Sequence, residues 1–116
     1  QVFAHASVAL VMANVEGRVM ESNLQFERLS GYSGGELKQL TLLSLTSPSD
    51  LQQTFELLSA MLTDGTGKAS KHVSAKAMLK SGDCDNLSLS LTLARDALGR
   101  PKFFLCHLLP QDHIAS

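Results

Sequence analysis

The sequence predicts an α+β domain in which a five-stranded antiparallel sheet carries its helices on one face. Between residues 22 and 65 the apolar positions recur at helical spacing, whereas in the last third of the chain they alternate with polar ones, as in half-buried strands. A hairpin pattern precedes the helical part. The 116 residues are enough for one hydrophobic core but not for a second domain.

The chain opens on two short apolar runs, at residues 8–14 and 17–21. The residues Val15, Glu16, Gly17 and Arg18 at the junction of the two runs include a glycine and charged residues, as is typical of a turn. These runs therefore predict a β-hairpin.

Two short helices are predicted next, with Gly31 as the stop between them. Ser22 with Gln25, and Ser33 with Glu36, have the spacing of capping boxes, in which side-chain oxygens accept hydrogen bonds from otherwise unpaired backbone N–H groups.

The leucine cluster of residues 42–45 indicates one more helical turn, which ends at Ser47. The longest helix begins there, because Ser47 can cap it, Pro48 suits the first helical position and Asp50 complements the helix dipole.

The apolar stripe of this longest helix faces the sheet, and Asp64 with Gly65 ends the helix where a left-handed cap is needed. The stripe consists of Leu51, Phe55, Leu58 and Leu62, widened by Leu57 and Met61.

Three strands are predicted in the last third of the chain. Residues 73–79 alternate, and residues 87–93 do so again after the turn at 81–83, with the leucines pointing inward. A second turn, at residues 96–101, leads to residues 103–109, which are apolar on both faces except for His107. A strand of that kind is usually central or covered.

The stretch from Asn23 to Leu37 reads N-x-x-F-x-x-L-x-G-Y-S-x-x-E-L. This wording resembles the signature of PAS (Per-Arnt-Sim) domains, which are small sensory and interaction modules, and the likeness extends from about residue 3 to residue 109. The predicted order of hairpin, helical crossover and three-stranded meander also matches what the resemblance implies. Two features depart from the family pattern. Gln39 replaces a usual glycine, and residues 109–112 replace a closing Asp-Ile-Thr that often couples the sheet to an output helix.

Composition excludes several other classes of protein. With 44% apolar residues and a formal net charge of −1, the chain is not disordered and lacks the basic surface that binds nucleic acid directly. No apolar run reaches the roughly 18 residues of a membrane span.

The two cysteines, Cys84 and Cys106, form no disulfide framework and indicate free thiols in a reducing compartment. We expect a cytoplasmic location, or a nuclear one if the parent is a eukaryotic transcription regulator, and a single domain (1–116) excised from a longer multidomain protein.

Motifs for catalysis and metal binding are present only in weak form, so the sequence predicts no enzyme and no metal site. Ser33 lies in a G-x-S-x-G pattern, but a helix precedes it where a nucleophile elbow needs a strand. Residues 65–68 resemble a phosphate-binding loop that lacks its first glycine and its magnesium-binding hydroxyl. Cys106 and His107 are neighbours on a strand, so their side chains leave opposite faces, and Cys106 is expected to be a small core residue.

The resemblance to PAS domains raises three cofactor hypotheses, and the cofactor stays unknown. Covalent flavin is disfavoured because residues 40–46 contain no cysteine, and a cinnamyl-type chromophore lacks a suitable cysteine for the same reason. Haem is disfavoured because residues 48–63 contain no histidine.

The leading hypothesis is a PAS-type regulatory module that senses a small apolar molecule or a partner and relays the signal to an effector domain. The alternative is a ligand-free dimerisation domain of a transcription regulator, a homodimer or heterodimer formed through the outer sheet face and the N-terminal segment. The candidate pocket residues are Leu10, Met12, Phe26, Leu29, Leu45, Phe55, Leu58, Leu89 and Leu91. The candidate interface residues are Val2, Phe3, Ala9, Val11, Phe103 and Leu105.

Overall fold

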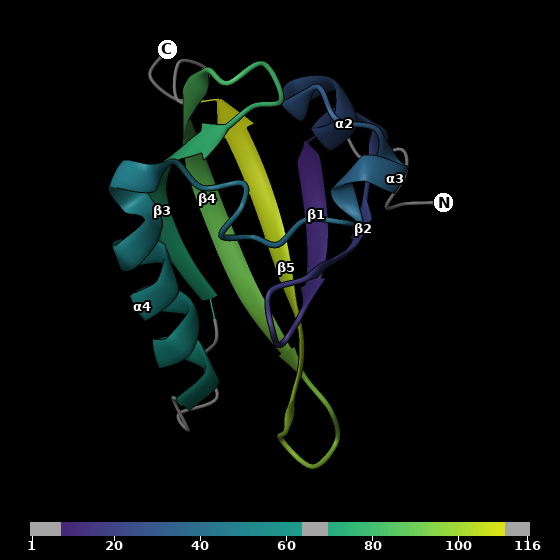
Figure 1. Cartoon of the computed structure of the whole chain (residues 1–116). Helices are drawn as coiled ribbons and strands as arrows, with labels where there is room; N and C mark the ends of the chain where they lie inside the picture. Colours follow the sequence, from purple (N-terminus) through teal and green to yellow (C-terminus); the bar gives the residue numbers. More distant parts are fainter. Residues whose placement is uncertain (1–7, 64–69, 111–116) are drawn as a thin grey trace.

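The computed structural model describes residues 8–63 and 70–110, and within them it contains the predicted α+β layout. Figure 1 shows a twisted five-stranded sheet, with the helices and their connections lying over one of its faces. All pairings are antiparallel, and the strand order is β2-β1-β5-β4-β3. The strands are β1 (Ala9–Asn14), β2 (Val19–Ser22), β3 (Ser70–Met78), β4 (Cys84–Arg95) and β5 (Pro101–Pro110). The helices are α2 (Leu24–Ser30), α3 (Gly34–Leu37), the 3-10 helix η1 (Pro48–Asp50) and α4 (Leu51–Thr63).

The first helix, α2, is capped by Asn23, so the predicted capping box of Ser22 with Gln25 is wrong. The Asn23 Oδ1 accepts hydrogen bonds from the backbone N–H groups of Phe26, at 3.0 Å, and of Leu10, at 2.9 Å. Its Nδ2 donates to the carbonyl of Val8 at 2.8 Å. Ser22 cannot take this place because it is the last residue of β2 and pairs with Val11 in the sheet.

The predicted stop and the second capping box are confirmed. Gly31 ends α2 with a φ of 84°, a left-handed conformation that glycine adopts without strain. At α3 the Ser33 hydroxyl accepts from the backbone N–H of Glu36, and the Glu36 carboxylate accepts from that of Ser33. The carboxylate also forms a 2.8 Å ion pair with Lys80.

We expect the Glu36 carboxylate to make stability depend on pH. Its pKa is lowered, first by the hydrogen bond from Lys80 and then by that from Ser33. The stabilisation is therefore fully present above the ordinary carboxyl pKa and is lost as the pH falls through the lower folded-state pKa. Urea midpoints measured between about pH 7 and about pH 3 should fall less for Glu36→Gln than for the wild type. Glu21→Gln, on an exposed strand position, is the control, and equal acid sensitivity of Glu36→Gln and wild type would contradict the expectation.

A connection of six residues, 41–46, crosses the covered face of the sheet and is fastened to both of its edges. We call it the strap. At one end Thr41 forms an isolated bridge with Arg18 beside β2, and at the other Thr46 forms one with Ala77 of β3. Figure 1 shows the strap running between α3 and α4 in front of the central strands. The expected extra helical turn is reduced here to hydrogen-bonded turns, because the two bridges hold the ends of the strap in an extended form.

The longest helix, α4, follows η1 directly. Ser47 precedes η1, but its hydroxyl lies 3.0 Å from that of Ser49 and makes no capping bond, so this detail of the prediction is wrong. Pro48 does occupy the first helical position. The Asp50 carboxylate accepts from the backbone N–H of Lys76 at 2.9 Å and so joins the start of the helix to β3.

The buried face of α4 is narrower than the predicted stripe. Leu58 and Met61 are buried, and Leu57 and Leu62 pack against the core, but Leu51 and Phe55 are 42% and 54% exposed. Leu51 and Phe55 therefore lie outside the buried face of α4. The predicted end at Asp64 and Gly65 lies outside the described residues.

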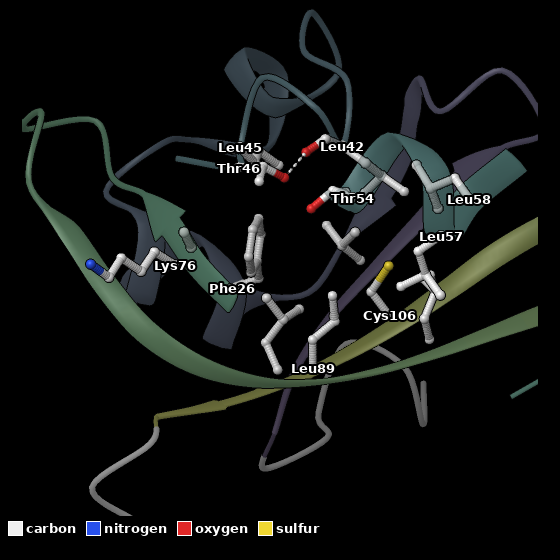
Figure 2. A pocket seen from close by; sticks show the side chains of 14 residues that line it. Phe26, Leu42, Leu45, Thr46, Thr54, Leu57, Leu58, Lys76, Leu89 and Cys106 are labelled. Atoms are coloured by element: carbon white, nitrogen blue, oxygen red, sulfur yellow. Dashed lines mark hydrogen bonds between the residues drawn. The ribbon is translucent and has the colours of Figure 1, made fainter. Parts of the chain in front are cut away.

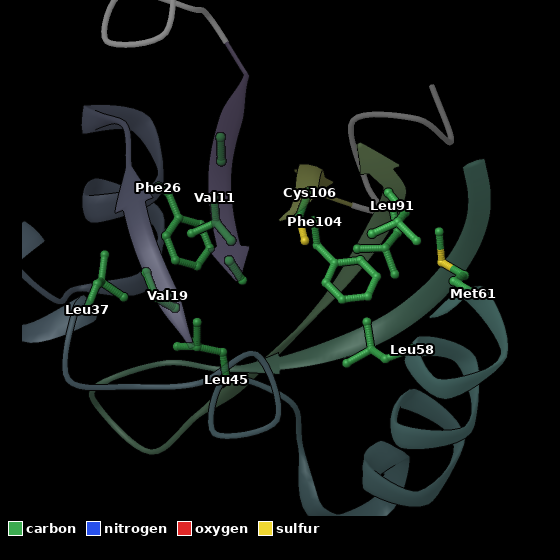
Figure 3. Close-up of a cluster of buried hydrophobic side chains, with 13 residues drawn as sticks. Val11, Val19, Phe26, Leu37, Leu45, Leu58, Met61, Leu91, Phe104 and Cys106 are labelled. Atoms are coloured by element: carbon green, nitrogen blue, oxygen red, sulfur yellow. The ribbon is translucent and has the colours of Figure 1, made fainter. Parts of the chain in front are cut away.

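One hydrophobic core lies between the sheet and the covering segments, as Figure 3 shows. On β5 the alternation is as predicted, with Phe104 and Cys106 pointing into the core. On β1 the predicted alternation is inverted, because Val11 points inward. The reason is that β1 is apolar on both faces, so its pattern alone cannot choose between them. The core cluster consists of Ala9, Val11, Ala13, Val19, Phe26, Leu37, Leu45, Leu58, Met61, Leu91, Leu93, Phe104 and Cys106.

Candidate functional site

A small apolar cavity lies inside this core, between the sheet, the strap and the first half of α4 (Figure 2). Its volume is about 60 Å³. Since cores are packed nearly as densely as organic crystals, a void among leucines is a candidate site for a small guest molecule. The lining residues are Val11, Phe26, Leu42, Leu45, Thr46, Thr54, Leu57, Leu58, Lys76, Ala77, Leu89, Leu91, Cys106 and Leu108.

The structure brings five of the nine candidate pocket residues to this cavity and places four elsewhere. The five are Phe26, Leu45, Leu58, Leu89 and Leu91. Leu10 and Met12 alternate with Val11 on β1 and so leave the opposite face of the sheet. Leu29 packs against the core outside the cavity, and Phe55 lines a separate hollow.

Sequence reasoning missed the polar members of the lining. Thr54 precedes Leu57 and Leu58 by three and four residues, a spacing that puts all three on one face of the helix and could have revealed it. Val11 was missed because of the inverted alternation on β1. No pattern in the sequence points to Thr46, because its place in the cavity wall depends on the path of the strap.

The polar groups around the cavity differ in whether they are free to form a hydrogen bond with a guest molecule. The Thr46 hydroxyl donates to the carbonyl of Leu42 at 2.9 Å, while the Thr54 hydroxyl points into the space (Figure 2). Lys76 is exposed, and Figure 2 shows its ammonium group directed away from the cavity, so that its aliphatic stem forms part of the rim. Among the residues that the structure describes, the cavity therefore presents no charged group to a guest.

The Cys106 thiol lies in the cavity wall and is 2% exposed. Desolvation by burial raises the pKa of this thiol to about 12. It is therefore a neutral thiol at physiological pH, not the nucleophilic thiolate. Its burial confirms the expected core position, while the side chain of His107 is exposed. Within the described ranges no group of three or more histidine, cysteine or acidic side chains could hold a metal ion.

A second hollow, of about 290 Å³, lies on the other side of Leu58, between α4 and the β1–β2 turn. Phe55 and Leu62 line it from the helix, and Leu43 lines it from the strap. Because Leu58 borders both spaces, its side chain separates the inner cavity from the outer hollow.

The outer face of the sheet carries a short apolar row. Met12 pairs with Leu105, and Phe103, two residues before Leu105, lies on the same face; all three side chains are partly buried. Ala9 and Val11, which were expected on this face, belong to the core instead, for the reason given for β1. Val2 and Phe3 lie outside the described residues.

The Ser33 motif forms no catalytic site in the described part of the chain. The Ser33 hydroxyl is engaged in the capping box, and a helix precedes it. The phosphate-loop-like residues 65–68 lie outside the described residues.

Comparison with known proteins places this geometry among PAS domains. No family model matches the chain. It is 26% identical over 104 residues to the sensor histidine kinase TmoS of Ectopseudomonas mendocina, a match that covers 90% of this chain and 10% of that protein. It is 24% identical over 105 residues to the probable diguanylate cyclase DgcE of Escherichia coli K12, covering 90% of this chain and 9% of that protein. The chain thus spans about a tenth of the length of the curated relatives it matches.

Solved structures give the same result for the fold. The PAS domain of a protein from Colwellia psychrerythraea superposes with a TM-score of 0.82 at 19% identity, over 94% of this chain and 90% of that one. A LOV protein of Rhodobacter sphaeroides superposes with a TM-score of 0.78 at 18% identity, over 95% of this chain and 62% of that one. The chain has the fold of a PAS domain, so the resemblance predicted from the motif is confirmed at the level of the fold. No helix within the described ranges is long and apolar enough to cross a membrane.

Proposed function

We propose that this chain is a PAS-type sensory module that couples occupancy of its inner cavity to an effector elsewhere in a longer polypeptide. The observation that carries the proposal is the apolar cavity beneath the strap, because it offers a binding site within the core. The similarity to segments of a sensor histidine kinase and a probable diguanylate cyclase supports a signalling parent with an effector of such a class. In this proposal the domain is cytoplasmic and is not itself an enzyme.

The proposed relay is a shift between two packings of the covering segments on the sheet. A guest can shift that equilibrium only if it binds one packing better than the other. The strap is a suitable moving part, since its Leu42 and Leu45 contact the cavity while its ends are bridged to Arg18 beside β2 and to Ala77 of β3.

The size of the cavity favours a small guest over a large cofactor. Sites for drug-sized ligands and cofactors have volumes of roughly 300–1,000 Å³, whereas this cavity has about 60 Å³. The residues present therefore do not fit a flavin or a haem in this packing, and the similarity to a LOV protein is carried over only as a likeness of fold.

Filling the cavity should abolish binding. We expect Ala77→Val, which adds two methyl groups to the wall, to remove the amide NMR shifts that a fragment library of small apolar molecules induces in the wild type. Ala94→Val on β4, outside the cavity lining, is the matched control and should bind as the wild type does. If native mass spectrometry and the library both find no guest for the wild type, the sensory proposal fails.

The outer apolar row supports a second proposal, which is pairing with another PAS-like chain, as in a dimerisation domain of a transcription regulator. Met12, Phe103 and Leu105 lie on adjacent central strands, and a two-fold pairing would remove them from water. We expect a dimer in sedimentation at micromolar concentration and a monomer for Phe103→Glu, while Lys102→Glu leaves the dimer in place. A wild-type monomer would argue against this proposal and leave the cavity proposal untouched.

A further inference from the structure

Two threonines of the same helix, Thr54 and Thr63, use their hydroxyl groups differently. Thr63 donates back to the helix, with its oxygen 3.2 Å from the carbonyls of Ser59 and Ala60, which is the usual arrangement for threonine in a helix. Among the described residues, the Thr54 hydroxyl makes no such bond and no other hydrogen bond, and Figure 2 shows it directed into the cavity. Thr54 thus offers both a donor and an acceptor to a guest.

The rest of the lining restricts what Thr54 can meet. The Thr46 hydroxyl already donates to Leu42, so it has only acceptor capacity left for a guest. The Lys76 ammonium is directed outward, and the Cys106 thiol is neutral. Placing an unpaired ion in such a wall carries a large desolvation penalty, so the lining selects neutral molecules.

The volume limits the guest further. An apolar cavity of roughly 150 Å³ admits benzene, and about 60 Å³ is well below that. A guest that enters without rearranging the core therefore has only a few non-hydrogen atoms, and a single hydrogen bond is a large share of its binding energy.

We propose that Thr54 determines the specificity of the cavity, which takes a small, neutral, mainly apolar molecule that carries one hydroxyl or carbonyl oxygen. The proposal rests on the sensory function proposed above. The hydroxyl of Thr54 donates to the oxygen of the guest, and a guest hydroxyl in turn donates to Thr46 or Thr54. The remainder of the guest lies against the leucines and Phe26.

The test uses a matched set of probes with the same small number of non-hydrogen atoms: ethanol, acetaldehyde and the isosteric hydrocarbon propane. Dissociation constants are measured by NMR titration of the amide resonances, for the wild type, Thr54→Val, Thr54→Ser and the same-helix control Thr63→Val. We expect Thr54→Val to weaken the binding of the two oxygen-bearing probes by about 3- to 10-fold and to leave the binding of propane unchanged or tighter. Thr54→Ser retains the preference for oxygen, and Thr63→Val binds all three as the wild type does.

Two outcomes would overturn the proposal, and they are distinguishable. If the wild type binds the probes but Thr54→Val weakens all three equally or none of them, the assignment of Thr54 is wrong and the sensory function stands. If the wild type shows no shifts at the cavity residues with any probe, the cavity takes no guest of this size and the sensory function fails with it.

Discussion

Replacing Asn23 by alanine is expected to lower the free energy of unfolding by about 2–4 kcal/mol. The amide side chain, 1% exposed, performs three tasks at once, as the cap of α2, the partner of the Leu10 N–H and the donor to the Val8 carbonyl. Because β2 ends at Ser22, the side chain of Asn23 supplies the acceptor that another sheet residue would otherwise provide. Alanine leaves the buried N–H of Leu10 without a partner. Urea unfolding measures the loss of stability, with the same slope of unfolding free energy against urea concentration for both proteins.

A second asparagine provides the matched control. The Asn14 Oδ1 also accepts from two backbone N–H groups, those of Glu16 and Arg18, each at 3.0 Å. That turn is exposed, so water replaces the lost acceptor in Asn14→Ala and the loss stays below about 1 kcal/mol. Equal losses for the two variants would mean that the burial of Asn23 has no role in its contribution.

Truncating Phe104 is expected to have an effect at least as large. Its ring is fully buried at the centre of β5, and Phe104→Ala should lower the free energy of unfolding by about 3–5 kcal/mol, the range for large core aromatics. The neighbouring Phe103 points to the other face, so Phe103→Ala should have a much smaller effect when measured at a concentration that keeps the chain monomeric.

This pair of variants also tests the assignment of the two faces. If Phe103→Ala proves the more destabilising of the two, the core lies on the opposite face of β5 from the one described. Calorimetry of both variants under the same buffer conditions gives the comparison directly.

The fold was predictable because its signals are local. Gly31, the Ser33–Glu36 capping box and Pro48 each satisfy a requirement of the backbone within a few residues, and the structure confirms all three. The alternating leucines of β4 similarly define its inward face, with Leu91 and Leu93 buried.

The errors arise where two local solutions compete and distant contacts decide. Ser22 and Asn23 are both good caps, and sheet pairing by Ser22 leaves the cap to Asn23. In β1 the inward and outward faces were predicted the wrong way round. Leu10 and Met12 were therefore wrongly assigned to the pocket, and Val11 was wrongly left out of it.

Five of the fourteen lining residues were therefore accessible to sequence reasoning, and the others depended on tertiary geometry. Helical and strand periodicity identified Leu58, Leu89 and Leu91. Helical spacing places Thr54 on the same face as Leu57 and Leu58, but no pattern in the sequence indicates that its hydroxyl is free of the helix backbone.

The strap gives this small domain a mechanical property. One six-residue connection is bonded to both margins of the sheet, and three of its side chains, those of Leu42, Leu45 and Thr46, contact the interior space. In the proposed relay, a guest that widens this space pushes the connection away from the sheet, and the two bridges transmit that strain to the margins of the sheet.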